Sequence, residues 1–145
     1  MKVKVKVPAT SANLGPGFDV AGLALTLYNT FTFELADQGL NITGCPEQFC
    51  NEENMTYQAF KQAAEICGLE YQGVNIECSG DVPYTRGLGS SSTCIVAGIV
   101  GAFAFKDKVE DRQEILELAT AIEGHPDNVA PAIFWRLDSI SNGRR

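Results

Sequence analysis

The chain has 145 residues, of which 45% are hydrophobic and 20% are charged, and its formal net charge is −7. A chain of this length suits one domain with a sizeable core, and the composition is ordinary for a globular protein. The acidic balance argues against a surface for nucleic acid or for an anionic membrane, because both would need clustered positive charge.

The first ten residues, MKVKVKVPAT, alternate lysine and valine ahead of Pro8. This period-two pattern predicts a half-buried strand that Pro8 ends, and it lacks the continuous apolar segment of a secretory signal. The longest apolar stretch, Cys94–Phe105, is about half of the ~20 residues that a membrane-spanning helix needs. We therefore expect a cytoplasmic protein without a transmembrane segment.

A constrained loop, TSANLGPGFDVAG, follows the first strand. Apolar residues then occupy most odd positions of Leu23–Leu35, which predicts a long strand or a hairpin. Gly39, Gly44 and Pro46 predict a loop after it. The N-terminal third of the chain is thus expected to consist of extended segments and loops.

A helix and a strand are expected next. Apolar residues recur at helical spacing in Met55–Ile66, and Gly68 is a suitable C-terminal stop. Asn54, just before this helix, is interpreted as its N-cap in preference to an adenine contact. Alternation in Val74–Cys78 then predicts a strand that leads into a turn rich in glycine and serine.

This turn and the residues after it, 82–98, read VPYTRGLGSSSTCIVAG. Backbone N–H groups at such a turn, together with the positive end of a helix dipole, can bind phosphate. A Walker A loop is excluded because no lysine follows Gly89, and the third glycine of the dinucleotide fingerprint is missing. The residues alone leave two interpretations open: a phosphate-binding loop, or a plain glycine turn with serine caps.

Two helices are predicted between Thr93 and Gly124. Thr93–Phe105 is apolar all round and predicts a central helix, although two glycines interrupt it. Asp111 and Glu114 form an aspartate version of the capping box, and the helix behind them stops at Gly124. HPDNVAPAIF follows, and the final eleven residues, WRLDSISNGRR, have no clear periodicity. Strands followed by packed helices predict an α+β domain.

The cysteines are odd in number and contain no Cys-x-x-Cys pair. This pattern argues against a disulfide framework and against a zinc site. We expect reduced thiols that pack as small hydrophobic groups. They are Cys45, Cys50, Cys67, Cys78 and Cys94.

Three segments taken together resemble the GHMP small-molecule kinases, and within that superfamily the homoserine kinases. They are PATSANLGPGFDVAGLAL, VPYTRGLGSSS and EGHPDNVAPA, in this order, and the resemblance runs from about Lys4 to Phe134. It implies a ribosomal-S5-domain-2-like fold with a left-handed βαβ unit, against the general handedness rule. It also implies phosphorylation of the L-homoserine side-chain hydroxyl by ATP, a step in threonine biosynthesis.

The resemblance implies a magnesium-nucleotide site. Ser91 would supply a hydroxyl and Glu123 a carboxylate to Mg²⁺, which usually takes only one or two ligands from protein. Glu123 ends a helix, where the dipole disfavours negative charge, so a cation beside it makes sense; a solvated glutamate is the alternative. Arg86 either lends charge to the nucleotide or faces solvent. The nucleotide-binding residues would be Pro83, Tyr84, Thr85, Arg86, Gly87, Leu88, Gly89, Ser90, Ser91, Ser92 and Thr93.

The resemblance also implies a substrate site. Asp19 would face the ammonium group of homoserine, and Asn13 its other polar groups; both could instead hydrogen-bond their own turn. His125 is either a substrate contact or a helix cap. Asn128 would lie near the reacting hydroxyl and would act with Ser91 and Glu123 in catalysis. No histidine base is required, because the hydroxyl proton can pass to the phosphate itself.

The chain also departs from the family. The C-terminal GHMP domain, with its third glycine-rich motif and the arginines that hold the substrate carboxylate, is not matched. We therefore expect residues 1–134 to form the N-terminal ATP-binding domain and residues 135–145 an atypical tail. A truncated or frame-shifted homoserine kinase with little activity and with exposed apolar surface is the hypothesis that follows.

Other functions stay open beside this one. They are a non-catalytic fragment that binds Mg-ATP, a GHMP kinase acting on mevalonate or a sugar, and an RNA-binding domain, against which the net charge of −7 speaks. The sequence also leaves open whether the chain forms a homodimer.

Overall fold

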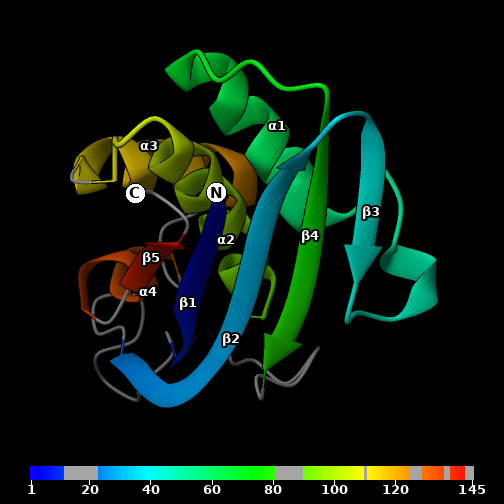
Figure 1. Ribbon diagram of the computed structural model, residues 1–145. Coiled ribbons are helices and arrows are strands. Elements are labelled where there is room, and N and C mark those ends of the chain that lie inside the picture. The colour runs from blue at the N-terminus through cyan, green and yellow to red at the C-terminus, as the bar shows by residue number, and fades with distance from the viewer. Residues whose placement is uncertain (12–22, 81–89, 110, 125–128, 136–137, 143–145) are drawn as a thin grey trace.

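Figure 1 shows the computed structural model of the chain, which describes residues 1–11, 23–80, 90–109, 111–124, 129–135 and 138–142. Within these residues the fold is α+β, as predicted, with a mixed sheet that carries its helices on one face. The strands lie in the order β3 (Gly39–Thr43), β4 (Gly73–Gly80), β2 (Leu23–Ala36), β1 (Lys2–Ser11) and β5 (Asp138–Asn142). The helices are α1 (Met55–Cys67), α2 (Ser90–Phe105), α3 (Arg112–Glu123) and α4 (Val129–Trp135), with a 3-10 turn, η2 (Glu47–Phe49).

Strand β1 follows the predicted alternation but does not end at Pro8. It continues to Ser11, and Pro8 pairs with Tyr28 of β2 just before a register shift. On its other side β1 pairs with β5 only over Lys2–Lys6. The missing N–H of Pro8 therefore costs no bond to β5, which is why proline is tolerated at this edge position.

Strand β2 is one long strand, which resolves the choice between a strand and a hairpin. It pairs antiparallel with β1 and with β4, so it lies inside the sheet. Phe31 and Phe33 are buried on the helix side together with the valines of β1, whereas the alternating lysines of β1 are exposed. Leu27, an odd position as well, is 38% exposed.

The predicted loop around Gly39 is wrong in its first part, because Gly39–Thr43 forms strand β3. This strand runs parallel to β4, with Ile42 paired to Ile76, and both side chains are buried. The pairing partner comes more than thirty residues later, after α1, and the local sequence alone does not reveal it.

Helix α2 is the central helix, and it begins at Ser90, earlier than the predicted Thr93. Its residues from Ile95 to Ala104 are buried between the sheet and the other helices. Gly98 allows this packing, because a Cβ there would collide with the Thr56 carbonyl oxygen and lie 2.8 Å from the Ala59 Cβ of α1. A glycine that looks unfavourable within a helix is thus explained by the close approach of α1.

The predicted ends of α1 and α3 are confirmed. The Asn54 side chain accepts a hydrogen bond from the Tyr57 N–H at 3.1 Å, and Asp111 accepts one from the Glu114 N–H at 3.0 Å. Both helices end at a glycine in the left-handed conformation, Gly68 for α1 and Gly124 for α3. Each of these helix ends depends on residues that are neighbours in the sequence, and for that reason the sequence predicted them.

Two elements follow α3 where the sequence indicated none. Helix α4 has Pro131 in its first turn, where its missing N–H costs nothing, and Arg112 donates a hydrogen bond to the Ile133 carbonyl oxygen. The predicted tail contains β5, which pairs antiparallel with β1. None of the helices in the described part of the chain combines the length and the apolar character needed to cross a bilayer.

Candidate functional site

The start of α2 brings together two residues that the sequence selected. The Ser91 hydroxyl donates a hydrogen bond to Glu123 Oε1 over 3.2 Å, although the two residues are 32 positions apart. Ser91 lies in the first turn of α2, at the positive end of its dipole, and Glu123 is the last residue of α3. Two side-chain oxygens that could ligate a metal ion, from different helices, therefore meet at the N-terminus of α2, where the helix dipole also favours an anion.

The next two residues of α2 are buried polar side chains. Ser92 is fully buried, and among the described residues its Oγ has no hydrogen-bond partner. Thr93 is fully buried as well, and its Oγ1 accepts a hydrogen bond from Asn29 Nδ2 at 3.0 Å. Because a buried polar atom without a partner costs free energy, Ser92 Oγ is a candidate for contact with a bound group.

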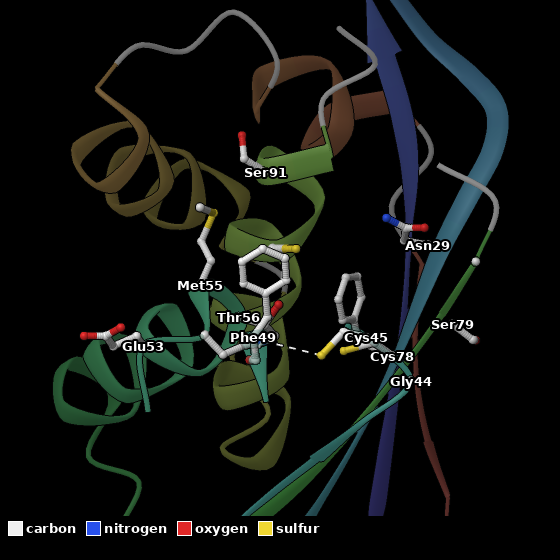
Figure 2. Close-up of a pocket in the computed structure, with 14 residues that line it drawn as sticks. Asn29, Gly44, Cys45, Phe49, Glu53, Met55, Thr56, Cys78, Ser79 and Ser91 are labelled. Carbon is white, nitrogen blue, oxygen red and sulfur yellow. Dashed lines mark hydrogen bonds between the residues drawn. The ribbon is translucent and has the colours of Figure 1, made fainter. Parts of the chain in front are cut away.

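A cavity of about 330 Å³ opens beside this helix start. Figure 2 shows Ser91 at one end of it, and Cys45 and Cys78 at the other. Phe49 and Met55, which are 46% and 45% exposed, line it together with Asn29 of β2. The cavity is of the size that a small ligand occupies, and it combines apolar walls with a few polar groups.

Thiols form part of the same cavity wall. The sulfur atoms of Cys45 and Cys50 lie 3.2 Å apart, and Cys45, Cys78 and Cys94 line the cavity. Burial, with the neighbouring Cys50 thiol, raises the pKa of Cys45 from 9.0 to about 11, and burial raises that of Cys78 to about 12. Burial also raises the pKa of Cys94. Thiols held protonated in this way are poor ligands for metal ions.

The number of oxygen ligands that Ser91 and Glu123 offer fits Mg²⁺. Among the described residues no group of three or more histidine, cysteine, aspartate and glutamate side chains could enclose a metal ion. Ser91 and Glu123 offer two oxygens on one side only. Mg²⁺ is commonly held by one or two protein oxygens, with phosphate oxygens and water completing its shell, so this pair suits a metal that arrives with a phosphate.

Several predicted site residues lie outside the described part of the chain. They are Asn13, Asp19, Pro83, Tyr84, Thr85, Arg86, Gly87, Leu88, Gly89, His125 and Asn128. Of the predicted nucleotide loop, Ser90–Thr93 form the first turn of α2. The proposed contacts of homoserine therefore remain predictions.

The sequence did not identify the cavity or the thiol pair. Asn29, Phe49 and Met55 come from three different segments, and no local motif connects them. The spacing of Cys45 and Cys50 matches no familiar motif, so the sequence predicts two separate packing residues. The one feature of the sequence that indicates a short distance between the two thiols is the turn between them, which begins at Pro46.

Comparison with known proteins adds a family to this geometry. Residues 54–136 match the family model described as the GHMP kinases N terminal domain. A homoserine kinase of Clostridium beijerinckii is 54% identical over 133 residues, which are 91% of this chain and 45% of that protein. The chain spans about half the length of the curated relatives that it matches.

Solved structures agree with the fold. A structure from Listeria monocytogenes that is described as a homoserine kinase matches 90% of this chain and 46% of its own, with a TM-score of 0.75 and 40% identity. The mevalonate kinase of Methanococcus jannaschii matches 96% of this chain and 53% of its own, with a TM-score of 0.74. Its 18% identity supports the shared fold alone.

Proposed function

The chain belongs to the GHMP kinase family as a homologue of the homoserine kinases, and we propose that it forms the nucleotide-binding part of such an enzyme. The reaction would be transfer of the γ-phosphoryl group of ATP to the side-chain hydroxyl of L-homoserine, in the cytoplasm and within threonine biosynthesis. The observation that carries the proposal is the contact of Ser91 with Glu123 at the start of α2, beside the cavity.

Phosphoryl transfer mainly requires that the reactants are positioned and that the phosphate charge is neutralised. Residues around the cavity and at the start of α2 could perform both tasks. The cavity beside α2 would take the nucleoside of ATP, with Phe49 and Met55 against the base. The N–H groups of the first turn of α2, and the Ser92 hydroxyl, would orient the phosphates. Ser91 and Glu123 would hold Mg²⁺, which when bound neutralises phosphate charge.

The acceptor side of the site rests on the family resemblance. Asp19 would bind the ammonium group of homoserine, Asn13 and His125 its other polar groups, and Asn128 would lie at the reacting hydroxyl. The hydroxyl proton would pass to the transferred phosphate, so no side chain has to act as a base. The left-handed crossover is likewise a proposal, and the unit to which it applies is β3–α1–β4, a parallel pair joined by a helix.

Titration calorimetry of the 145-residue chain with ATP tests the nucleotide site. We expect binding in the presence of Mg²⁺ and weaker binding when the metal is removed by a chelator, because the phosphates then lose their bridge to Ser91 and Glu123. RNA serves as the negative control, since the chain carries a net charge of −7. Absence of heat with Mg-ATP would contradict the proposal.

A substrate panel tests the acceptor. Homoserine, mevalonate and a sugar are offered with Mg-ATP, with ADP release as the readout, to this chain and to the Clostridium beijerinckii homoserine kinase in parallel. Turnover of homoserine alone supports the assignment, and turnover of another acceptor replaces it. Binding of Mg-ATP without turnover identifies a non-catalytic unit.

A further inference from the structure

Two cysteines near the cavity form a pair that the phosphoryl-transfer proposal does not use. Cys45 Sγ and Cys50 Sγ are 3.2 Å apart, and both side chains are half-buried. Cys50 Sγ also donates weakly to the Cys45 carbonyl oxygen at 3.5 Å, so its thiol is directed back toward Cys45. A disulfide requires the two sulfurs to approach to about 2.05 Å, a movement of roughly one ångström from here.

The turn that carries both cysteines is held firmly in place. Gly44 has a φ of 85° and lies so close to β4 that a Cβ would collide with the Cys78 carbonyl oxygen. At the other end, the Cys50 N–H donates to the Glu47 carbonyl oxygen at 3.0 Å, and Asn54 Nδ2 donates to the Phe49 carbonyl oxygen at 2.9 Å. The pairing of the sulfurs is therefore a property of the folded turn.

We infer that Cys45 and Cys50 are a site of reversible disulfide formation beside the cavity that Cys45 lines, with a low-molecular-weight disulfide such as oxidised glutathione as the oxidant. The Cys50 thiolate attacks the oxidant, forms a mixed disulfide and releases one thiol. The Cys45 sulfur then attacks the Cys50 sulfur, releases the second thiol and closes the ring, while its proton passes through solvent to the leaving group. Two protein thiols are oxidised, and one disulfide is reduced to two thiols.

The order of attack follows from the surroundings of each sulfur. Cys45 lines the cavity, as do Cys78 and Cys94, and burial raises its pKa to about 11, so it stays protonated at neutral pH. Cys50 follows the exposed residues Gln48 and Phe49 of η2. An external disulfide therefore meets Cys50 first, and Cys45 is the resolving thiol.

Mass spectrometry of the folded 145-residue chain after incubation with oxidised glutathione tests the site. Remaining thiols are blocked by alkylation, and a glutamate-specific protease cleaves after Glu47, between the two cysteines. We expect the wild type to lose two alkylation sites and to yield the Cys45 and Cys50 fragments joined by a disulfide. The same treatment in urea should abolish this selectivity, because the turn is then unfolded.

Single variants test the assigned roles. Cys45→Ser should retain one glutathione on Cys50, since no resolving thiol remains, and Cys50→Ser should acquire neither the disulfide nor the adduct. Cys67→Ser is the matched control, because Cys67 is buried at the far end of α1 and should leave the result unchanged. A link from Cys45 to Cys78, or no loss of alkylation sites in the folded wild type, would overturn the inference.

The position of Cys45 in the cavity wall predicts that a bound ligand shields the pair. This part rests on the proposed function, and the disulfide itself does not. Saturating Mg-ATP should slow disulfide formation several-fold. An unchanged rate while calorimetry detects binding would refute the shielding, whereas an unchanged rate without binding would refute the nucleotide proposal instead.

Discussion

Ser91 and Glu123 show what a single pair of side chains contributes. A serine in the first turn of one helix and a glutamate at the end of another are each ordinary, and only their approach to 3.2 Å makes them a candidate metal site. A carboxylate at a helix C-terminus is disfavoured by the dipole unless a cation lies nearby. The hydroxyl of Ser91 satisfies one carboxylate oxygen and leaves the other available for a metal ion.

Glu123→Gln should weaken the binding of Mg-ATP, because the amide removes the negative charge that a cation would neutralise. We expect a loss of affinity of roughly tenfold, the scale of one charged contact, and a similar loss for Ser91→Ala. Calorimetry with Mg²⁺ present measures it. Glu117→Gln is the matched control, since Glu117 is exposed on the same helix. Equal affinity of the Glu123 variant and this control would exclude the metal role.

Two half-buried thiols and a half-buried tyrosine predict how the free energy of unfolding depends on alkaline pH. Burial raises the pKa of Cys45 from 9.0 to about 11, that of Cys78 to about 12, and that of Tyr71 from 10.0 to about 12. The folded chain retains protons that the unfolded chain has released, so the free energy of unfolding should be constant below pH 9 and fall between pH 9 and about 12.

Urea denaturation with a reductant present, at pH values inside and below this window, measures that dependence. The variant Cys78→Ala removes one of the three groups and should flatten the decline. A free energy of unfolding that stays level above pH 9 would show that these side chains are not buried as described.

At the scale of elements, the contact of α1 with α2 holds the site together. Helix α2 carries Ser91, and α1 carries Met55 at the cavity, so their separation decides the width of the cavity. Gly98 sits at the contact, where the two backbones approach closely.

Gly98→Ala should destabilise the fold by about 1–3 kcal/mol, because overpacking forces the two helices apart. The obstacle is backbone, the Thr56 carbonyl oxygen and the Phe60 nitrogen at 2.8 Å, and backbone cannot rotate away. Gly101→Ala is the comparison, since the atoms nearest to its Cβ belong to the Phe33 ring at 2.7–2.9 Å, a side chain and not backbone. Urea denaturation should find the larger loss for Gly98, and the reverse order would refute this account of the packing.

At the scale of the whole molecule, the chain covers 45% of the length of the Clostridium beijerinckii homoserine kinase. More than half of that relative has no counterpart in these 145 residues. We expect the isolated chain to phosphorylate homoserine far more slowly than that relative. A coupled assay of ADP release compares the two, and turnover at the relative's rate would contradict the expectation.

Association of the chain is a separate prediction at this scale. We expect the 145-residue chain to associate or aggregate, because large apolar side chains such as Phe49, Met55 and Ile66 are exposed. Light scattering over a range of concentrations measures the molar mass, and a monomer at every concentration would contradict the prediction. The division into residues 1–134 and a tail stays a prediction as well, and β5 in that tail pairs with β1.

The sequence by itself determined the elements whose signals are local. The sequence predicted the caps at Asn54 and Asp111, the glycine stops of α1 and α3, and the alternation of β1. Each of these features depends on residues that are close together in the sequence. The family followed from three motifs in order, of which the described residues contain only parts.

Tertiary structure alone decided the rest. Strand β3 exists because β4 pairs with it, Pro8 is tolerated because β5 stops short of it, and Ser91 meets Glu123 because α2 and α3 pack together. The thiol pair and the cavity likewise depend on segments that meet only in the folded chain. The physical reason is the same in each case: the stabilising partner is distant along the chain, and a local pattern carries no information about a distant partner.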